Sequence, residues 1–145
     1  MATKEERINE LAEESLKYFS HDTNAHEDIK CKKLLRRYGP AGYGRFWLLC
    51  EALGYAHGHK IQLQTDDDLE LLTDELRFKE PGECMEYLEG LKEIGLIEMP
   101  AKGFIWSNRM MKNARYFGEK RLRGHNGAVR RWQKKRESTD TTEEE

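Results

Sequence analysis

The chain of 145 residues and 17.1 kDa has the size of one domain, which excludes a multidomain enzyme. Charged residues make up 36% of the chain and hydrophobic residues 37%, so the core must come from well-placed apolar faces. The longest apolar run, Phe46–Cys50, is far shorter than the roughly 20 residues of a membrane span. No signal-peptide core follows Met1. We therefore expect a soluble intracellular protein.

The net charge of −2 conceals a strong segregation of charge along the chain. Residues 109–136 contain eleven Lys or Arg and one Glu, a net +10. Residues 1–108 contain 14 basic and 21 acidic residues, a net −7, and residues 137–145 contain five acids and no Lys or Arg, a net −5. An acidic body with a basic arm is the pattern expected of a protein with a nucleic-acid partner.

The cysteines and histidines give no sign of a metal or disulfide framework. Cys31, Cys50 and Cys84 are widely spaced and unpaired in sequence, so we expect reduced thiols in the core or on the surface. The pair His57 and His59 lacks a carboxylate or thiol at matching spacing, and a polar turn is the favoured interpretation. No metal and no cofactor are expected.

Three helices are predicted in the first part of the chain. Apolar residues at helical spacing predict an amphipathic helix over Lys4–Lys17. Asp28 starts a second helix, Ile29–Tyr38, which Gly39 and Pro40 end. A wide apolar face over Pro40–Ala56 predicts the central core helix.

Short strands and two further helices follow. The alternation of His59–Gln64 predicts a strand, and Thr65, whose hydroxyl is placed to accept from the amide of Asp68, predicts a cap for a helix over Thr65–Lys79. Pro81 opens a helix over Pro81–Ile94. A hairpin is expected from two apolar runs that a Pro- and Gly-containing connection joins, and these are Leu96–Met99 and Phe104–Trp106.

This order of elements predicts a mainly α fold with a small β-hairpin. It is the order of a winged helix-turn-helix with an added N-terminal helix and a basic C-terminal helical arm. In this arrangement Pro81–Ile94 takes the place of the recognition helix, and Leu96–Trp106 forms the wing. We divide the chain into an N-terminal amphipathic helix (1–17), a winged-helix domain (18–108), a basic arm (109–136) and a disordered acidic tail (137–145).

One motif resembles the N-terminal domain of phage replisome organisers, the DnaD-like replication initiators. The residues that carry the resemblance are Tyr18–Asn24, Asp28–Lys30 and Tyr38–Leu53, and the likeness continues in order to about Arg123. The motif also has a physical explanation: its glycines allow a tight turn and a close helix approach, and its aromatic residues fill the junction. These residues are Gly39, Gly42 and Gly44, with Tyr38, Tyr43, Phe46 and Trp47.

The resemblance implies a winged-helix fold, DNA binding, self-association and a role in phage or prophage replication, in the cytoplasm of a bacterial or phage-infected cell. Family members usually continue into a linker and a second helical domain, so helicase loading by that domain is not expected of residues 1–145. The expected partners are DNA, duplex or single-stranded, together with replication proteins or a second copy of the chain. Neither a membrane nor a small-molecule substrate is expected.

The helix in the recognition position departs from the family's expected use. Between Glu80 and Gly95 there are five Glu and one Lys, a net −4, and DNA phosphates would repel such a helix. A partner-binding role fits its exposed acids better, and these are Glu83, Glu86, Glu89 and Glu93.

No sequence motif of an enzyme is present. The chain has no phosphate-binding loop, no nucleophile elbow and no zinc-protease motif. The run Asp66–Asp68 is best explained as acidic residues at the positive end of a helix dipole. We therefore expect a protein without enzymatic activity.

The basic arm is the predicted nucleic-acid site. Phosphate neutralisation by Lys and Arg, with an occasional stacking aromatic, gives sequence-tolerant binding. The predicted contact residues are Arg109, Lys112, Arg115, Lys120, Arg121, Arg123, Arg130, Arg131, Trp132, Lys134, Lys135 and Arg136. The alternative is a solvated basic helix that packs an apolar face on the acidic body, through Met110, Ala114, Phe117 and Leu122.

A second basic patch and two other functions remain open. The patch consists of Lys30, Lys32, Lys33, Arg36 and Arg37, for which we favour a solvated helix face over a phosphate track. Besides a DNA-binding protein, the sequence allows a protein-interaction module. It also allows a phage-encoded inhibitor whose acidic body occupies a basic nucleic-acid-binding protein.

Overall fold

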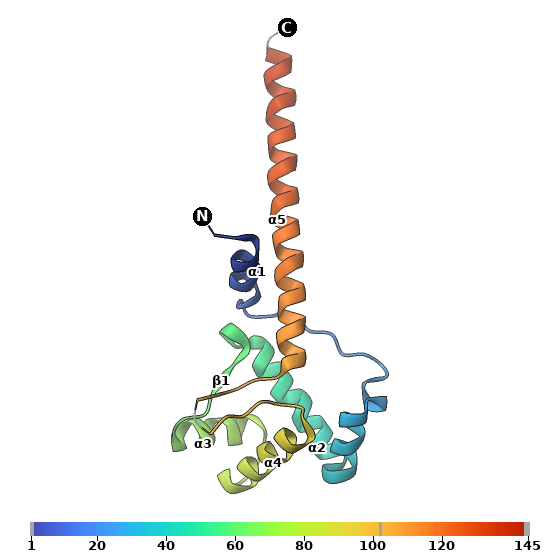
Figure 1. Cartoon of the computed structure of the whole chain (residues 1–145), viewed down its shortest axis with the longest axis vertical. Helices are drawn as coiled ribbons and strands as arrows, with labels where there is room; N and C mark the ends of the chain where they lie inside the picture. The colour runs from blue at the N-terminus through green and yellow to red at the C-terminus, as the bar shows by residue number, and fades with distance from the viewer. Residues whose placement is uncertain (1, 102, 144–145) are drawn as a thin grey trace.

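Figure 1 shows a computed structural model of the chain, with one long helix rising from a group of shorter elements. The structure describes the backbone of residues 2–101 and 103–143, and the side chains of these residues as far as Arg136. Within this part the protein is mainly helical with a two-stranded antiparallel sheet. The expectation of a mainly α fold is confirmed.

The N-terminal helix α1 spans Lys4–Ala12 and begins at the predicted residue. A capping box fixes this start, because the amide of Glu6 donates to the Thr3 hydroxyl while the amide of Thr3 donates to the Glu6 carboxylate. Ile8 is buried and the charged residues around it are exposed. The prediction of an amphipathic helix is right for this segment.

The predicted end of this helix, Lys17, is wrong. Glu13 and Glu14 follow the last turn, where the negative end of the helix dipole disfavours carboxylates. The chain turns there, and Leu16 enters the core with its amide donating to the carbonyl of Gly54 over 2.9 Å.

Helix α2 spans Ile29–Tyr55 and joins the two helices predicted as Ile29–Tyr38 and Pro40–Ala56. Asp28 caps it as expected, since its carboxylate accepts from the amides two and three residues later. Gly39 interrupts the helix with φ 71° and ψ −170°. The predicted halves therefore exist, but they meet at a kink and not at a loop.

Two short 3-10 turns, η1 (Ala25–Glu27) and η2 (His57–His59), flank α2, and strand β1 (Ile61–Gln62) follows η2. The predicted strand, from His59 to Gln64, is therefore too long at both ends. His59 has a positive φ of 55° and a buried ring, which belong to a turn and not to a strand.

Helix α3 spans Asp66–Glu75, inside the predicted Thr65–Lys79. The predicted cap is confirmed, because the Thr65 hydroxyl accepts from the amide of Asp68 over 3.2 Å. The helix ends about one turn early, where Arg77 takes a positive φ of 64°.

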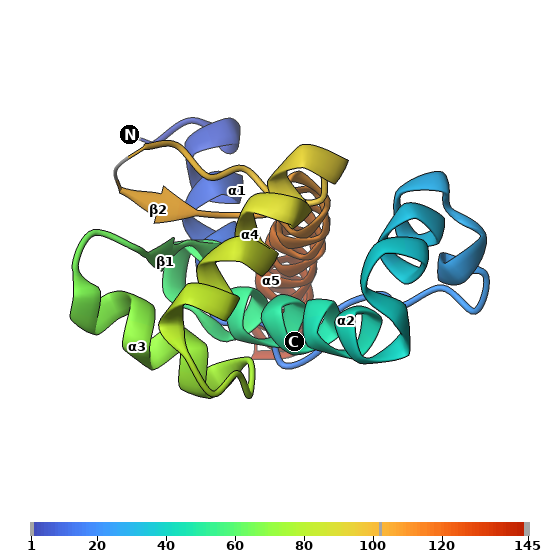
Figure 2. The ribbon, with the colours of Figure 1, turned by 90° about the horizontal axis from the view of Figure 1, so that it is seen from below.

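Helix α4 spans Pro81–Ile94, with the predicted bounds. Pro81 occupies the first turn, and Gly95 ends the helix in the left-handed conformation with φ 91°. Figure 2 shows α4 lying across α2 with the sheet to one side. The largest fully buried side chains of this core are Leu34, Phe46, Leu49, Leu53, Leu76, Leu88, Leu91 and Ile105.

The second strand, β2 (Phe104–Ile105), pairs with β1 in antiparallel orientation. The predicted hairpin between Leu96–Met99 and Phe104–Trp106 is reduced to one bridge, Glu98 with Trp106. The physical reason is that the amide of Leu96 still donates to a carbonyl of α4, so the chain leaves the helix too late to form a longer strand. The hairpin prediction was wrong about the main partner of β2.

Tyr38, just before the kink of α2, packs onto two glycines. A Cβ on Gly42 would collide with the Tyr38 side chain, and a Cβ on Gly90 of α4 would collide with the Tyr38 hydroxyl. The Tyr87 hydroxyl donates to the carbonyl of Gly42. The sequence motif is therefore a packing motif at this junction, although the space beside Gly44 is open.

Helix α5 spans Asn108–Glu143 and has two different halves. Met110, Ala114 and Leu122 are buried against the body, and beyond Arg123 the helix projects away from it (Figure 1). The segment 137–145, predicted to be disordered, is helical in its backbone as far as Glu143. Residues 144–145 and the side chains of 137–143 lie outside the described part.

Helices α1 and α5 come very close at Gly118. A Cβ at this position would lie 2.7 Å from the carbonyl oxygen of Ile8 and 3.0 Å from the amide nitrogen of Ala12. Because both atoms belong to the backbone, no side-chain rotation can relieve the clash. The contact between the two helices therefore requires glycine.

We expect Gly118→Ala to destabilise the protein by about 1–3 kcal/mol, because overpacking a tight contact costs this much. Gly124→Ala is the matched control, since nothing lies within 4 Å of a Cβ at Gly124 on the same helix. It should stabilise the helix by about 0.5–1 kcal/mol. Urea unfolding of both variants checks this, and a Gly118→Ala variant as stable as the wild type would contradict the close approach.

The buried acidic groups of the core predict a loss of stability at alkaline pH. Burial raises the pKa of the Cys50 thiol to about 12, and it also raises the pKa of Cys84 and Tyr87. These groups keep their protons in the folded protein while the unfolded chain releases them, so stability should be full below pH ~9 and fall as the pH rises toward 12. Unfolding free energies measured across this range should have a shallower slope in Cys50→Ala, and an unchanged slope would contradict the assignment.

Candidate nucleic-acid interface

Three of the predicted contact residues are used to hold α5 on the body. Arg109 pairs with Asp22 at 3.6 Å, and its guanidinium lies 5.7 Å from the ring centre of Trp47. Arg115 pairs with Glu5 of α1 at 2.6 Å and with Glu119 at 3.4 Å. The acidic residues near the start of the chain thus neutralise part of the basic arm within the same molecule.

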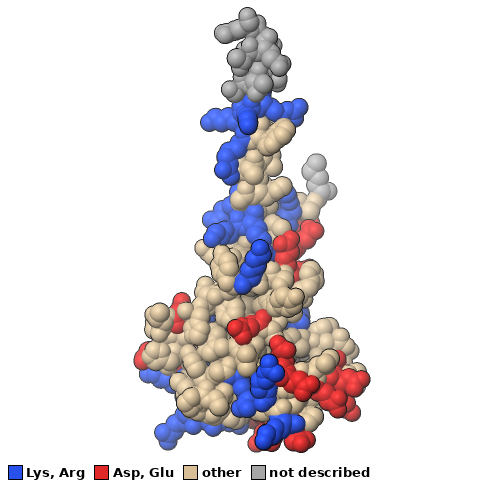
Figure 3. Space-filling view, turned by 180° about the vertical axis from the view of Figure 1, so that it is seen from behind, with Lys and Arg blue, Asp and Glu red and all other residues tan. Residues whose placement is uncertain are grey.

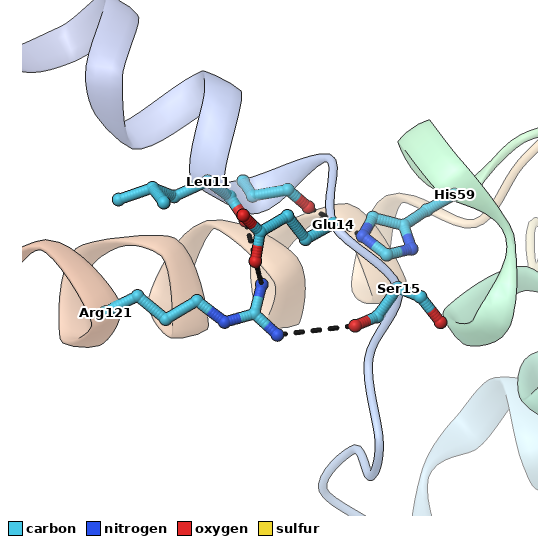
Figure 4. A network of polar contacts seen from close by, with 6 residues as sticks. Leu11, Glu14, Ser15, His59 and Arg121 are labelled. Atoms are coloured by element: carbon cyan, nitrogen blue, oxygen red, sulfur yellow. Dashed lines mark hydrogen bonds and ion pairs between the residues drawn. The ribbon is translucent and has the colours of Figure 1, made fainter.

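Arg121 makes the most extensive of these contacts (Figure 4). Its guanidinium donates to the carbonyl of Leu11 at 2.8 Å and to that of Ser15 at 3.3 Å, and it pairs with Glu14 at 3.4 Å. These groups form the end of α1 and the turn after it, whose carbonyls have no partner within the helix. Arg121 therefore fastens the C-terminal end of α1 to α5.

His59 makes a second contact at the C-terminal end of α1. Its Nε2 lies 2.6 Å from the carbonyl oxygen of Ala12, and its Nδ1 lies 3.0 Å from that of Leu53. The ring is buried and joins the end of α1 to the end of α2. The expected polar turn is right for His57, which is exposed and pairs with Glu13. It is wrong for His59, whose ring is buried.

A different subset of the basic residues lies on one exposed face of α5. Positions spaced by three or four residues share a helix face. The cationic stripe, as we define it, consists of Lys112, Lys120, Arg123, Arg130 and Lys134, with exposed Tyr116 between the first two. In Figure 3 blue side chains follow the projecting helix upward, while red ones gather low on the body.

The side chains of the stripe are exposed, and none has a polar or ring contact with another residue whose side chain is described. From Lys112 to Lys134 the stripe extends about 33 Å along the helix, at 1.5 Å per residue. This is about one turn of duplex DNA. The stripe is therefore a surface of positive charge without a partner among the described side chains, and it has the length of a nucleic-acid contact.

The other predicted contact residues lie off this face. Arg131 donates to the carbonyl of Gly127 at the edge of the stripe, whereas Arg136 lies 5.9 Å from the ring centre of Trp132. At about 100° per residue, Trp132 falls on the opposite side of the helix from Arg123. Trp132 is 68% exposed, but a ligand on the stripe would not reach it. Lys135 is exposed between these two faces.

The predicted partner-binding acids are on the surface of α4. Glu83, Glu86 and Glu89 are exposed, and so is Glu93, which pairs with Arg37 of α2 at 2.7 Å. This hydrogen bond raises the pKa of Arg37. The structure thus places all four carboxylates on a solvated face.

The second basic patch is partly neutralised by its neighbours. Lys30 donates to the carbonyl of Gly95 at the end of α4, Lys32 pairs with Glu27, and Arg37 with Glu93 as described. A cation is favourable at a helix C-terminus, which gives Lys30 a structural role. Three of the five cations of this patch therefore contact other protein groups, whereas the favoured interpretation of a solvated helix face describes exposed Lys33 and Arg36.

Two residues beside the stripe, Lys4 and Asn126, are not predicted from the sequence. Both line an open notch between α1 and α5, and their proximity depends on the antiparallel packing of segments that are far apart in sequence. The stripe itself has a sequence signal, because its cations are 8, 3, 7 and 4 residues apart, and each interval is three or four residues or a sum of such steps along one helix face. A helical-face analysis of residues 109–136 would have found it.

Among the described residues, no group of three or more His, Cys, Asp or Glu side chains is placed to hold a metal ion. Cys31, Cys50 and Cys84 are free thiols in the interior, so the core alternative of the thiol prediction is right. Within the same residues, no helix has both the length and the apolar character of a membrane span.

Fold and surface together define a mainly helical domain with a small antiparallel sheet and a long helix that carries a stripe of exposed positive charge. The chain belongs to the Lin1244/Lin1753-like family, whose N-terminal model matches residues 18–110. No curated protein and no solved structure matches the chain. The family match begins at Tyr18, where the sequence motif also begins, and it ends near the start of α5.

The division of the basic residues into two sets predicts different effects on stability. Arg121→Gln should destabilise the protein by about 1–3 kcal/mol, because it leaves carbonyls and a carboxylate without their charged donor. Arg123→Gln, two residues later, removes an exposed side chain without a described partner and should change stability by less than about 0.5 kcal/mol. Thermal and urea unfolding would measure both, and equal effects would contradict the division.

Proposed function

We propose that the chain is a non-enzymatic DNA-binding protein that contacts the nucleic-acid backbone through one face of α5. The observation that supports this most is the cationic stripe, whose five cations have no described side-chain partner. Duplex DNA presents about one phosphate charge per 1.7 Å of its axis, so a row of cations about 33 Å long has many phosphates within reach. Contacts of this kind position a protein on DNA without reading its sequence.

The body does not offer a better surface for phosphates. Helix α4 presents Glu83, Glu86 and Glu89 to solvent and would repel a DNA backbone. The second basic patch on α2 is partly paired with Glu27 and Glu93. Both observations favour α5 as the contact.

We further propose that residues 18–108 form a winged helix similar to that of phage replisome organisers. The order α2, β1, α3, α4 and β2 supports this proposal, as does the position of β2 between β1 and the bridge at Glu98. A role in phage or prophage replication rests on the resemblance of Tyr18–Leu53 alone. The acidic α4 would then stand in the recognition position without entering a groove.

A second candidate function is the binding of a basic protein by the acidic body, as an interaction module or an inhibitor. Tyr55 and Leu71 are 77% and 70% exposed and border a cavity of about 340 Å³, together with Asp68 and Glu75. Exposed apolar residues with an acidic rim favour an apolar and basic partner. This candidate predicts no DNA affinity for the protein itself.

The test uses charge substitutions and not deletion of the arm, because loss of residues 109–145 would remove Met110, Ala114 and Leu122 from the core. We expect the wild-type protein to bind a mixed-sequence DNA, with an affinity that falls steeply with salt, by about 0.9 in log–log slope for each duplex phosphate neutralised. A variant with four stripe cations changed to Gln should lose most of this affinity and flatten the slope by about 3–4. The substitutions are K120Q, R123Q, R130Q and K134Q, and fluorescence anisotropy with duplex and single-stranded oligonucleotides is the measurement.

The matched control changes four exposed lysines of the body and has the same net charge. Its substitutions are K17Q, K33Q, K79Q and K92Q, at positions that make no described side-chain contact. This control should bind DNA nearly as the wild type does. Equal losses in the two variants would refute the stripe as the contact, and a wild-type protein without DNA affinity at low salt would favour the second candidate.

A further inference from the structure

An open notch of about 640 Å³ separates the N-terminal turn of α1 from the middle of α5. Besides Arg115, whose ion pairs are described above, three exposed cations line it, with Lys4 on the α1 side and Arg123 and Arg130 on the α5 side. The two arginines belong to the cationic stripe, whereas Lys4 is about 120 residues away in sequence. The notch therefore joins the stripe to a second element of the fold.

The carboxylates of the notch neutralise its cations only in part. Glu5 and Glu119 both line it, and both are paired with Arg115, at 2.6 Å and 3.4 Å. Lys4, Arg123 and Arg130 make no described side-chain contact. Glu5 and Glu119 share the single charge of Arg115, so the four cations and two carboxylates of the notch leave a net charge of +2 facing the open space.

Other groups at the notch also favour an anion. The first turn of α1 ends there, and the positive end of a helix dipole attracts negative charge. The amide side chain of Asn126 lines the same space and supplies hydrogen-bond donors. The contact at Gly118 and the hydrogen bonds of Arg121 fix α1 on α5, so the distance across the notch is set by the fold before any ligand arrives.

We propose that the notch holds a phosphodiester group of a bound nucleic acid, with Lys4 on one side of the phosphate and Arg123 and Arg130 on the other. This inference rests on the proposed function and adds α1 to the nucleic-acid surface. Charged donors from two elements give a stronger and more directional phosphate contact than a single helix face. The phosphate in the notch fixes the position of the strand along the stripe, because the remaining cations follow at helical spacing.

The experiment compares single substitutions in the full chain by anisotropy with the same duplex and single-stranded oligonucleotides. Lys4→Gln should weaken binding several-fold and lower the salt slope by about 0.7–0.9, the value of one phosphate. Lys33→Gln, an exposed lysine of α2 without a described side-chain contact, is the matched control and should leave both quantities unchanged. Circular dichroism would verify that both variants keep the fold.

Double substitutions separate a shared phosphate from independent ones. If Lys4 and Arg130 hold the same group, the loss in K4Q/R130Q should be smaller than the product of the single losses. Lys112 belongs to the stripe but does not line the notch, so the losses in K4Q/K112Q should multiply. Multiplicative losses in both pairs would overturn the shared site.

Two outcomes distinguish the notch from the function on which it rests. If the stripe variant loses DNA affinity while Lys4→Gln behaves like Lys33→Gln, the notch is refuted and the stripe remains as the DNA contact. If the wild-type protein binds neither duplex nor single-stranded DNA at low salt, the proposed function and the notch both fail.

Discussion

The close contact of α1 with α5 is the constraint on which the rest of the surface depends. Gly118 lets the two backbones meet, Arg121 binds the carbonyls at the end of α1, and His59 ties the same end to α2. Two segments at opposite ends of the sequence thereby become one unit, which buries Ile8 and Leu122. The packing of α1 on α5 determines which cations pair within the protein and which remain exposed to a ligand.

The fold divides the basic residues of α5 into those that pair with other groups of the protein and those that remain exposed. Acidic residues of the first 22 positions pair with Arg109, Arg115 and Arg121, which are spaced six residues apart on α5. Five of the other cations, Lys112, Lys120, Arg123, Arg130 and Lys134, are left on one exposed face of the same helix. In the sequence, a helix packed on the body and a charged surface are alternatives for this segment. In the structure α5 is both, because one face of its first half packs on the body while its exposed face and its projecting half carry the cations. The net +10 of residues 109–136 overstates the charge that a ligand would meet.

Local signals were sufficient to predict much of the fold, and long-range contacts account for what was missed. The bounds of α4 follow from Pro81 and Gly95, and the start of α3 follows from Thr65, because caps are local. The partner of β2 could not be predicted in this way, since β1 lies about 40 residues earlier. The sequence places Arg121 among the ligand contacts. Its actual acceptors are main-chain carbonyls about 110 residues away, and because every residue has a main-chain carbonyl, the residue types there give no sign of the contact. The basic residues of the stripe could be predicted from the composition of the segment. The face that they share follows from the helical period alone.

The projecting half of α5 has a thermodynamic consequence of its own. Beyond Arg123 the helix projects from the body, and its exposed residues include Gly124, a poor helix former. Like charges also recur four residues apart there, at Arg130 with Lys134 and at Arg131 with Lys135, and each such pair disfavours an isolated helix by about 0.2–0.5 kcal/mol. An anion that neutralises these side chains removes the repulsion, so binding and helix formation are linked equilibria and each strengthens the other.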